Sequence, residues 1–347
     1  MRLTVLHAAL ALLLSIAAAC GTDATTPILP PPPPPPPPTT LQDGLWTVSG
    51  SPPAILRLDS TQLADTGQRD PATTVTTPSA GLHTLAGVAF DTAGNLWVAS
   101  EDDSLLLAFA PAALSSSGSK AARTVITPTR GSLGGPIGLA FDSQHRLWVV
   151  NSQSAKLVRF DPPQLAVGGA QAPAVILSLP GNPLGIAFDA AGSLWVCDNQ
   201  FHVIYKYTAD QLAASGSPPP VFVLTAADSL VNPTGLAFDA AGNLWVVNNG
   251  RSNVVAFSPA QLAGAGPLAP HIVIASNNGS LSIPIGLAFE EDGSLWVVGG
   301  SGALTKFAPA SLSTSGAPVP SARLKVRGHS VFFSVALWPK PAGLPLH

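Results

Sequence analysis

A unit of about fifty residues that recurs six times along the chain predicts an all-β protein, a six-bladed β-propeller. Proline supplies 36 of the 347 residues, which disfavours long helices, and 46% of the residues are hydrophobic, enough for a large core. A Leu-Trp pair marks every unit, with Trp46, Trp97, Trp148, Trp195, Trp245 and Trp296 at successive spacings of 51, 51, 47, 50 and 51 residues. A Gly-x-Ala-Phe-acid segment precedes all but the first pair, at residues 87–91, 138–142, 185–189, 235–239 and 286–290.

Each unit opens with two short strands joined by a tight turn. In the first complete unit we expect strand a at residues 88–90 and strand b at residues 96–99. Asp91 suits the start of the turn between them, and Gly94 supplies a positive φ. His145 replaces this glycine in the next unit, and since histidine tolerates a positive φ we interpret it as a turn residue. The repeated turn acids and tryptophans are therefore predicted to be structural.

The second half of each unit predicts two further strands and a helical turn. Apolar residues at 157–160 and 254–257 indicate strand c, and the run at 272–274 indicates an outer strand d. Between them, Ser258 followed three residues later by Gln261 forms the pattern of a capping box, which predicts one short helical turn. Four strands per unit, repeated around an axis, make the blade of a propeller.

The chain ends predict how the ring closes. The Leu45-Trp46 pair has no strand a before it, whereas residues 334–337 resemble that missing strand and lack the rest of a blade. We expect the C-terminal strand to complete a blade whose other strands come from residues 45–80, which removes the open sheet edges.

The N-terminus predicts export and lipidation. Residues 1–19 contain one basic residue, an apolar stretch and then small residues, as in a secretory signal peptide. Cys20, preceded by three alanines, resembles the lipidated cysteine of a bacterial lipobox, although Ala17 stands where that pattern prefers leucine. Ordinary signal cleavage is the alternative. The second cysteine, Cys197, lies beyond a long flexible tether, so a disulfide is not expected.

A proline-rich segment follows the lipidation site. Residues 30–38 are all proline, a polyproline II rod of roughly 28 Å that suits a stalk better than a ligand for a proline-binding domain. We therefore divide the chain into a signal peptide (1–19), a lipidated cysteine with a disordered stalk (20–40) and a propeller (41–347). The formal net charge of −3, without a basic cluster, gives no footprint for nucleic acid.

Residues 243–257 resemble an NHL repeat, and the whole unit is similar to those of streptogramin B lyases and gluconolactonase-like proteins. This resemblance covers about 300 residues and implies the propeller; for the enzymes it also implies Ca²⁺ or Mg²⁺ at the channel mouth. The gluconolactonase-like enzymes hold their metal with a Glu, an Asn and an Asp, and their Asn usually stands directly before the strand-a glycine. Here that position is occupied by Ala86, Ile137, Leu184, Thr234 and Ile285, so the metal site does not transfer.

One face of the propeller is predicted to surround the channel mouth, and the sequence places several polar residues there. Asn182 and Asn232 precede strand a, and His83 and His329 precede the first and last such strands. The residues three after each tryptophan mark the ends of the b strands, and they are Ser49, Ser100, Asn151, Asp198, Asn248 and Gly299. Such oxygen atoms suit Ca²⁺ or sugar hydroxyls, with Asp198 the candidate metal ligand. The alternative is that they cap strand ends.

These observations predict an exported, membrane-anchored lipoprotein that binds an envelope protein or a glycan without catalysis. The alternative is a lactonase or lyase that depends on a divalent metal, with His83 or His329 as the base. The acidic run at residues 101–103 is expected to be a solvated loop or an addition to a cation site near Asp198. Gly21 after the lipidated cysteine resembles the sorting pattern for the outer membrane of a bacterial cell envelope, with the protein either periplasmic or surface-exposed.

Overall fold

A computed structural model describes residues 41–78, 83–129, 132–226, 229–264 and 268–339. The chain divides into two units, Met1–Pro38 and Thr39–His347, and the second unit contains the described residues. The predicted signal peptide, Cys20 and the proline run lie outside these residues. No helix of the described part is long and apolar enough to cross a membrane.

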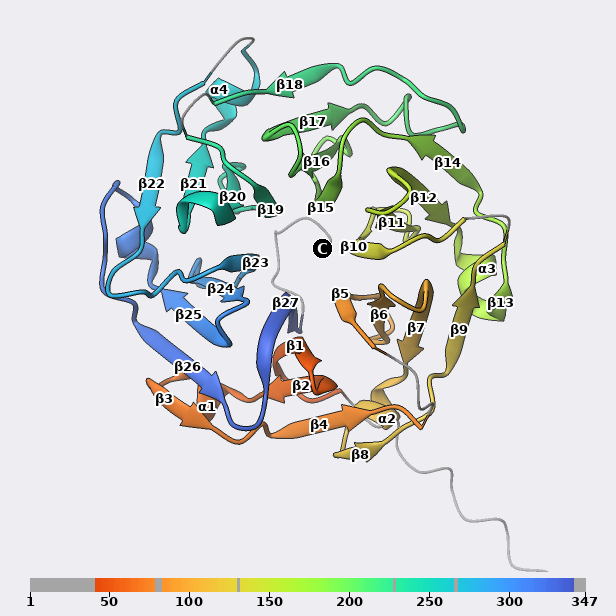
Figure 1. The fold of residues 1–347 in the computed structure, drawn as a ribbon, viewed down its shortest axis with the longest axis horizontal. Coiled ribbons are helices and arrows are strands. Elements are labelled where there is room, and N and C mark those ends of the chain that lie inside the picture. Colours follow the sequence, from red (N-terminus) through yellow and green to blue (C-terminus); the bar gives the residue numbers. More distant parts are fainter. Residues whose placement is uncertain (1–40, 79–82, 130–131, 227–228, 265–267, 340–347) are drawn as a thin grey trace, which may run out of the picture. The chain divides into compact units, whose positions relative to one another are not determined.

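Within the described residues, six β-sheets are arranged as blades around a central channel, which confirms the six-bladed β-propeller (Figure 1). From the channel outward, blade 1 contains β27 (Ser330–Trp338), β1 (Gly44–Ser51), β2 (Pro53–Leu58) and β4 (Thr73–Thr76). Blade 2 contains β5 (Leu85–Phe90), β6 (Leu96–Ser100), β7 (Leu105–Phe109) and β9 (Thr124–Thr127). Blade 3 contains β10 (Pro136–Phe141), β11 (Leu147–Asn151), β12 (Lys156–Phe160) and β14 (Val175–Ser178). Blade 4 contains β15 (Pro183–Phe188), β16 (Leu194–Asp198), β17 (Val203–Tyr207) and β18 (Phe222–Leu224). Blade 5 contains β19 (Pro233–Phe238), β20 (Leu244–Asn248), β21 (Asn253–Phe257) and β22 (Ile272–Ala275). Blade 6 contains β23 (Pro284–Phe289), β24 (Leu295–Gly299), β25 (Ala303–Phe307) and β26 (Ala322–Val326).

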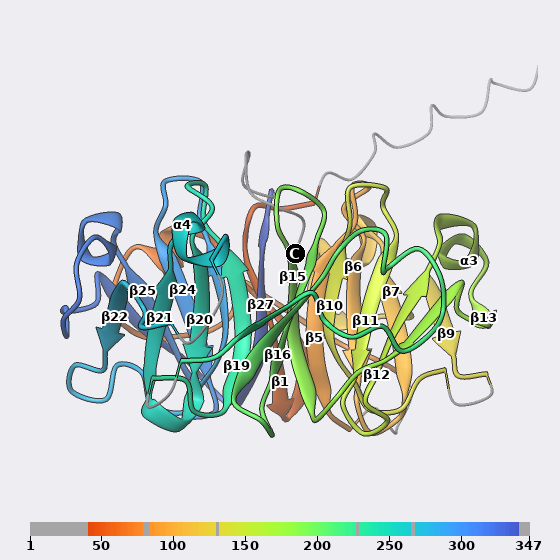
Figure 2. The ribbon, with the colours of Figure 1, turned by 90° about the horizontal axis from the view of Figure 1, so that it is seen from above.

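Blade 1 closes the ring as predicted, because the last strand of the chain pairs with the first. β27 runs antiparallel to β1, with Leu45 opposite Leu337 and Trp46 opposite Ala336. β1 is therefore bonded on both sides, to β27 and to β2. The strands of every blade run between the two faces of the propeller (Figure 2). We call the face with the a–b turns the turn face, and the face with the b–c loops and the segments entering strand a the channel-mouth face.

Short helical turns follow strand c, as the capping-box pattern predicted. They are α1 (Ser60–Leu63), α2 (Pro111–Leu114), α3 (Pro162–Val167), α4 (Pro259–Leu262) and the 3₁₀ turn η2 (Pro309–Leu312); a further 3₁₀ turn, η1 (Asn249–Arg251), lies in a b–c loop. At the start of α4, Ser258 and Gln261 form a capping box, in which each side chain bonds the other residue's backbone.

The turn acids have the structural role that the sequence predicted. Asp239 accepts hydrogen bonds through Oδ1 from the backbone N–H groups of Ala241 (3.0 Å) and Asn243 (2.9 Å). Its Oδ2 accepts from the indole Nε1 of Trp245 at 2.8 Å. Equivalent acid–indole bonds join Asp91 to Trp97, Asp142 to Trp148, Asp189 to Trp195 and Glu290 to Trp296. His145 occupies its turn with a φ of +60°, as expected.

Neighbouring inner strands approach so closely that the recurrent glycine of strand a is required. A Cβ placed on Gly185 would lie 2.6 Å from the carbonyl oxygen of Thr234 in the next blade. A Cβ on Gly87 would lie only 1.9 Å from the carbonyl oxygen of Ile137. Because no side chain fits at these distances, the Gly-x-Ala-Phe pattern reflects the packing of blade against blade.

The core lies between the blades. One cluster joins Trp245 and Ile274 of blade 5 to Leu287 and Phe289 of blade 6. The rings of Trp245 and Phe289 meet edge to face, with centroids 5.8 Å apart. Each recurrent tryptophan is thus buried between sheets, as predicted, rather than displayed to a ligand.

A feature that was not predicted joins the blades at the rim. After the helical turn, the chain pairs in parallel with the outer strand of the preceding blade, through β3 (Gly67–Arg69) on β26, β8 (Gly118–Ser119) on β4 and β13 (Gly169–Ala170) on β9. Isolated bridges from Gly216 to Leu177 and from Gly316 to Ile274 continue the pattern. These contacts cover the outer sheet edges, which would otherwise expose unpaired backbone groups.

Candidate binding site at the channel mouth

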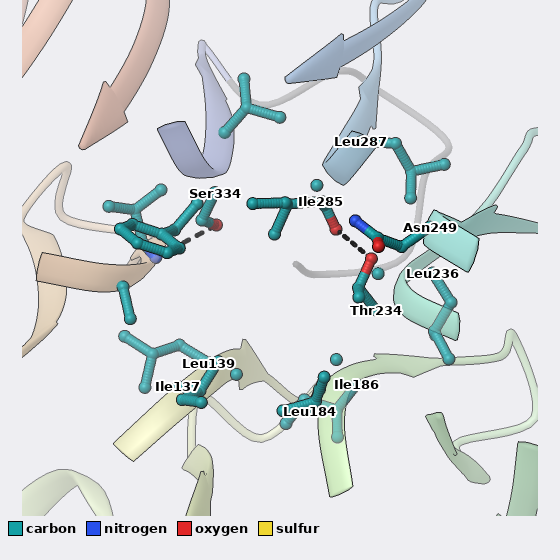
Figure 3. Close-up of a pocket in the computed structure, with 18 of the residues that line it drawn as sticks. Ile137, Leu139, Leu184, Ile186, Thr234, Leu236, Asn249, Ile285, Leu287 and Ser334 are labelled. Atoms are coloured by element: carbon teal, nitrogen blue, oxygen red, sulfur yellow. Dashed lines mark hydrogen bonds between the residues drawn. The ribbon is translucent and has the colours of Figure 1, made fainter. Parts of the chain in front are cut away.

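A cavity of about 300 Å³ occupies the central channel, and residues of all six inner strands line it (Figure 3). Two rings of side chains form its wall. The residues directly before the strand-a glycine form the outer ring, and these are Ala86, Ile137, Leu184, Thr234, Ile285 and Phe333. The residues directly after it form the deeper ring: Val88, Leu139, Ile186, Leu236, Leu287 and Val335. Both rings are almost entirely apolar.

The polar groups in this wall already have partners inside the protein. The Thr234 hydroxyl donates to the carbonyl oxygen of Ile285 at 2.9 Å. Ser334, which stands where the other inner strands have glycine, accepts from the Val88 N–H at 3.3 Å. The side-chain amide of Asn249 donates to the carbonyl oxygen of Pro284 at 2.8 Å. The walls therefore offer an incoming molecule an apolar surface.

Two residues of the b–c loops bring hydrogen-bond acceptors to the cavity. Glu101 follows β6 of blade 2, and Asn249 follows β20 of blade 5, on the opposite side of the ring (Figure 1). Both stand one position after the end of strand b, whereas the sequence analysis predicted binding residues at the strand end itself. The repeated frame could have identified them, because this position directly follows the buried strand end in each blade.

The Glu101 carboxylate is half-buried and unpartnered. Its backbone N–H donates to Thr84, but among the described residues its side chain has no hydrogen bond or ion pair. Burial raises the pKa of Glu101, and the neighbouring charge of Asp102 raises it further.

The strand-end residues Asn151, Asp198 and Asn248 are fully buried and bond to the loops beside them. Asn151 accepts from the Gly134 N–H at 3.0 Å, and Asn248 accepts from the Val231 N–H at 2.6 Å. None of the three belongs to the residues that line the cavity. The geometry matches the strand-capping alternative, and their binding role stays a prediction.

Asn182 and Asn232 lie on the channel-mouth face, partly exposed, and contribute backbone groups to it. The N–H of Asn182 donates to Oδ1 of Asp198 at 3.3 Å, and the N–H of Asn232 donates to Nδ1 of His202 at 3.0 Å. Asn232 has a φ of +52°, a conformation that asparagine tolerates. Neither residue lines the cavity, so a role in binding stays a prediction for them too.

Neither candidate base, His83 or His329, is among the described residues that line the cavity. His83 is exposed, with Nδ1 3.3 Å from Oδ1 of Asp103. His329 lies beside Pro52 in the closing blade; its Nδ1 is buried without a partner in the described structure, and burial lowers its pKa. Since neither histidine reaches the cavity, the geometry provides no support for a base at the channel mouth.

Asp198, the candidate metal ligand, has partners inside the protein for one carboxylate oxygen, and a metal at this residue stays a prediction. Oδ1 of this carboxylate accepts from the N–H groups of Gln200 (2.8 Å) and Phe201 (2.9 Å), so donors surround it where a metal would need oxygen ligands. Oδ2 is buried without a hydrogen-bond partner in the described residues and lies close to Gly181, on which a Cβ would be 1.8 Å away. The Asp198 side chain is fully buried; burial of Tyr207 and then the charge of Asp198 raise the pKa of Tyr207 to about 12. In the described residues, no three His, Cys, Asp or Glu side chains gather as metal ligands would.

The channel-mouth face also displays two large apolar side chains. Phe201, in a b–c loop, and Ile283, directly before β23, are each 53% exposed. Ile283 has a φ of +50°, which is an outlier for a β-branched residue. At the equivalent position, directly before the first residue of strand a, blade 3 has Gly135 and blade 5 has Asn232, residues that suit this conformation. The Ile283 carbonyl oxygen accepts from the Gly300 N–H at 2.9 Å, which helps to hold the strained backbone.

Comparisons with known proteins identify the architecture. No family model and no curated protein matches the chain. A structure of the nidogen/laminin complex is similar over 86% of this chain and 98% of that one, with a TM-score of 0.59 and 16% identity. A protein of unknown function from Bacteroides caccae is similar over 86% and 100%, with a TM-score of 0.59 and 10% identity. Virginiamycin B lyase from Staphylococcus aureus is similar over 65% and 67%, with a TM-score of 0.47 and 14% identity. At such low identities the likeness shows the fold alone, and the chain is a six-bladed β-propeller.

Proposed function

We propose that this protein is exported, held on a membrane of the bacterial envelope through Cys20, and binds another envelope protein at the channel-mouth face without catalysis. The signal-like segment at residues 1–19 and the lipobox resemblance of Cys20 support export and membrane anchoring. The channel-mouth face supports the binding role, because it carries the opening of an apolar cavity together with exposed apolar side chains.

The observation that carries this proposal is Ile283. A β-branched residue in the left-handed region costs about 1–3 kcal/mol, and such strain clusters at functional positions. Here an apolar side chain is 53% exposed on the channel-mouth face, at a backbone conformation in which Asn or Gly would be relaxed. An exposed apolar residue favours a protein partner over a glycan, which would need a surface of hydrogen-bonding groups.

Site-specific photocrosslinking tests the binding face. A photoreactive phenylalanine analogue at position 201 in the full-length chain should give a discrete adduct with one envelope protein in cells. The matched control is position 319, where Val319 is 76% exposed but precedes the outer strand β26, away from the channel mouth. The Ile283→Asn substitution should reduce the adduct at position 201. Absence of an adduct at 201, or the same adducts from both positions, would contradict the proposal.

Fractionation tests the anchor separately. The full-length chain should partition with membranes and incorporate labelled fatty acid, whereas Cys20→Ala should do neither. Membrane association that persists in Cys20→Ala would remove lipidation from the proposal while leaving the binding face untouched.

Metal titration separates binding from the metal-dependent lactonase or lyase. A cation at about 100 times its Kd would stabilise the fold by about 2.7 kcal/mol, a clear shift in melting temperature. For the Cys20→Ala chain we expect the same melt in EDTA, Ca²⁺ and Mg²⁺. A stabilising shift with stoichiometric metal would favour the enzyme and justify a screen of lactone and lyase substrates.

A further inference from the structure

The cavity combines an apolar wall with polar groups at its mouth, and the two together indicate the chemical class of its ligand. Its two rings are aliphatic apart from Thr234 and the aromatic Phe333, and the Thr234 hydroxyl donates its proton to Ile285. Among the described residues at the mouth, the Glu101 carboxylate and the side-chain oxygen of Asn249 have no hydrogen-bond partner; the amide nitrogen of Asn249 donates to Pro284. Both groups accept hydrogen bonds, which favours a ligand that brings donors.

The neighbouring acids strengthen the negative character of this rim while being held in place. Asp102 accepts from the Thr84 hydroxyl at 2.6 Å, and Asp103 accepts from the Ser100 hydroxyl at 2.6 Å. These bonds fix the loop that carries Glu101 and leave the Glu101 carboxylate as the acid that lines the cavity. A partly desolvated carboxylate without a partner attracts a cation more strongly than a solvated one does.

We propose that the cavity binds a small organic cation, an aliphatic body that carries one protonated amine. The aliphatic part lies between the two rings, where burial contributes about 25 cal/mol per Å² of apolar surface. The ammonium group lies at the mouth and donates hydrogen bonds to the Glu101 carboxylate. A volume of about 300 Å³ limits the ligand to a compact molecule and excludes a folded domain or an extended glycan.

This inference rests on the proposed function in that it assigns a ligand to the same face. It is nevertheless separable, because Phe201 and Ile283 do not line the cavity. A partner protein can contact these two residues whether or not a small cation fills the channel.

Calorimetric titration with matched probes tests the inference. The full-length chain carrying Cys20→Ala is titrated with octylammonium, octanoate and 1-octanol, which share one aliphatic chain and differ in the charge of the head group. We expect octylammonium to bind at least tenfold more tightly than octanoate, and 1-octanol to lie between them. Glu101→Gln should reduce the affinity for octylammonium at least tenfold and leave that for 1-octanol unchanged.

Two further variants control the result. Glu291→Gln removes an exposed acid from the turn face, and its affinity for every probe should match that of the parent chain. Leu184→Trp fills the outer ring and should abolish binding of all three probes, with Ile137→Phe as the second variant if the first does not fold. Equal affinity for octanoate, an unchanged Glu101→Gln variant, or no binding of any probe would each overturn the inference.

The two proposals fail separately. If the amine does not bind while position 201 still crosslinks, the cation site is wrong and the proposed function stands. If the amine binds but position 201 gives no adduct, the cation site stands and the protein-binding face is wrong.

Discussion

The two faces of the propeller are built on different principles. On the turn face, five acids each bond the indole of the same blade, from Asp91 with Trp97 to Glu290 with Trp296. On the channel-mouth face the residues differ from blade to blade. After strand b, Glu101 lines the cavity without a side-chain partner in the described residues, whereas Asn249 donates to a neighbouring carbonyl; before strand a, Ile283 is strained and exposed. Uniform local bonding marks the face that maintains the fold, and irregularity marks the face available for function.

The largest effect is expected on the turn face, from Asp239→Ala. Four donors of Ala241, Asn243 and Trp245 would lose their acceptor, and we expect a loss of about 3 kcal/mol in the free energy of unfolding. The control on the other face is Asp102→Ala, where one exposed bond to Thr84 is lost and a change of under about 1 kcal/mol is expected. Denaturant unfolding of both variants measures the difference. Equal losses would show that the two faces contribute alike to stability.

A smaller effect should separate two tryptophans that differ in one hydrogen bond. Trp245→Phe removes the indole N–H that Asp239 accepts, whereas Nε1 of Trp46 is buried without a partner in the described residues. Both substitutions lose buried area, so we expect Trp245→Phe to cost about 1 kcal/mol more than Trp46→Phe. Thermal melts of the pair provide the measurement. If Trp46→Phe is equally costly, the acid–indole bond contributes nothing beyond packing.

On the channel-mouth face, Ile283→Asn should stabilise the protein. Asparagine tolerates the φ of +50° that strains Ile283, so we expect a gain of about 1 kcal/mol and a higher melting temperature. The reciprocal change, Asn232→Ile, places a β-branched side chain at a φ of +52° and should lower the melting temperature by a similar amount. A loss of stability in Ile283→Asn would mean that the isoleucine is held by packing and is not strained.

The smallest effect is expected from Glu101→Gln and depends on pH. Because the pKa of Glu101 is raised in the folded protein, its charged form disfavours folding at neutral pH, and that penalty disappears as the pH falls through the raised pKa. Glu101→Gln should therefore melt slightly higher than the parent chain at about pH 7.5. The two chains should converge at about pH 3.5, below the usual Glu pKa of about 4.3. A difference that grows with acidity would contradict this sign.

The architecture was predictable because its signals are local and repeated. Within seven residues, Asp239 begins a turn, Gly242 supplies a φ of +78° and Trp245 enters the core, so one unit predicts the next. Ring closure was predicted because the first unit lacks a strand that the C-terminus supplies, and the pairing of β27 with β1 confirms it. Trp338 stands where a turn acid would be, and with that acid missing Trp46 lacks an acceptor in the described residues.

The rim contacts were missed although their signal recurs. Ser117, Ser215 and Ser315 each precede a glycine, and each hydroxyl accepts a backbone N–H from the outer strand of the preceding blade. Ser-Gly in a variable connection reads as an ordinary turn until the neighbouring blade is in place. The partner lies about 40 residues away, with separations of 43, 39 and 42, so no local pattern specifies it.

The residues predicted to bind lie on the same face as the cavity opening, but the residues that line the cavity stand one position later in the repeat. Strand-end residues such as Asn151 and Asn248 lie at the mouth in sequence order, yet their side chains turn sideways into the adjoining loop. The direction of a side chain at a strand end depends on the loop it meets, which a single unit does not reveal. Glu101 and Asn249, one residue later, face the cavity instead.

The place at which the chain enters the propeller determines how a pull on the N-terminus is borne. The chain reaches the ring at Leu41 and at once becomes β1, which lies in the interior of its sheet with β27 on one side and β2 on the other. A force applied there must break two antiparallel ladders together, one of them made by the last strand of the chain. A force on the N-terminal side of β1 is therefore resisted by strands from both ends of the polypeptide, and blade 1 is the blade that bears it.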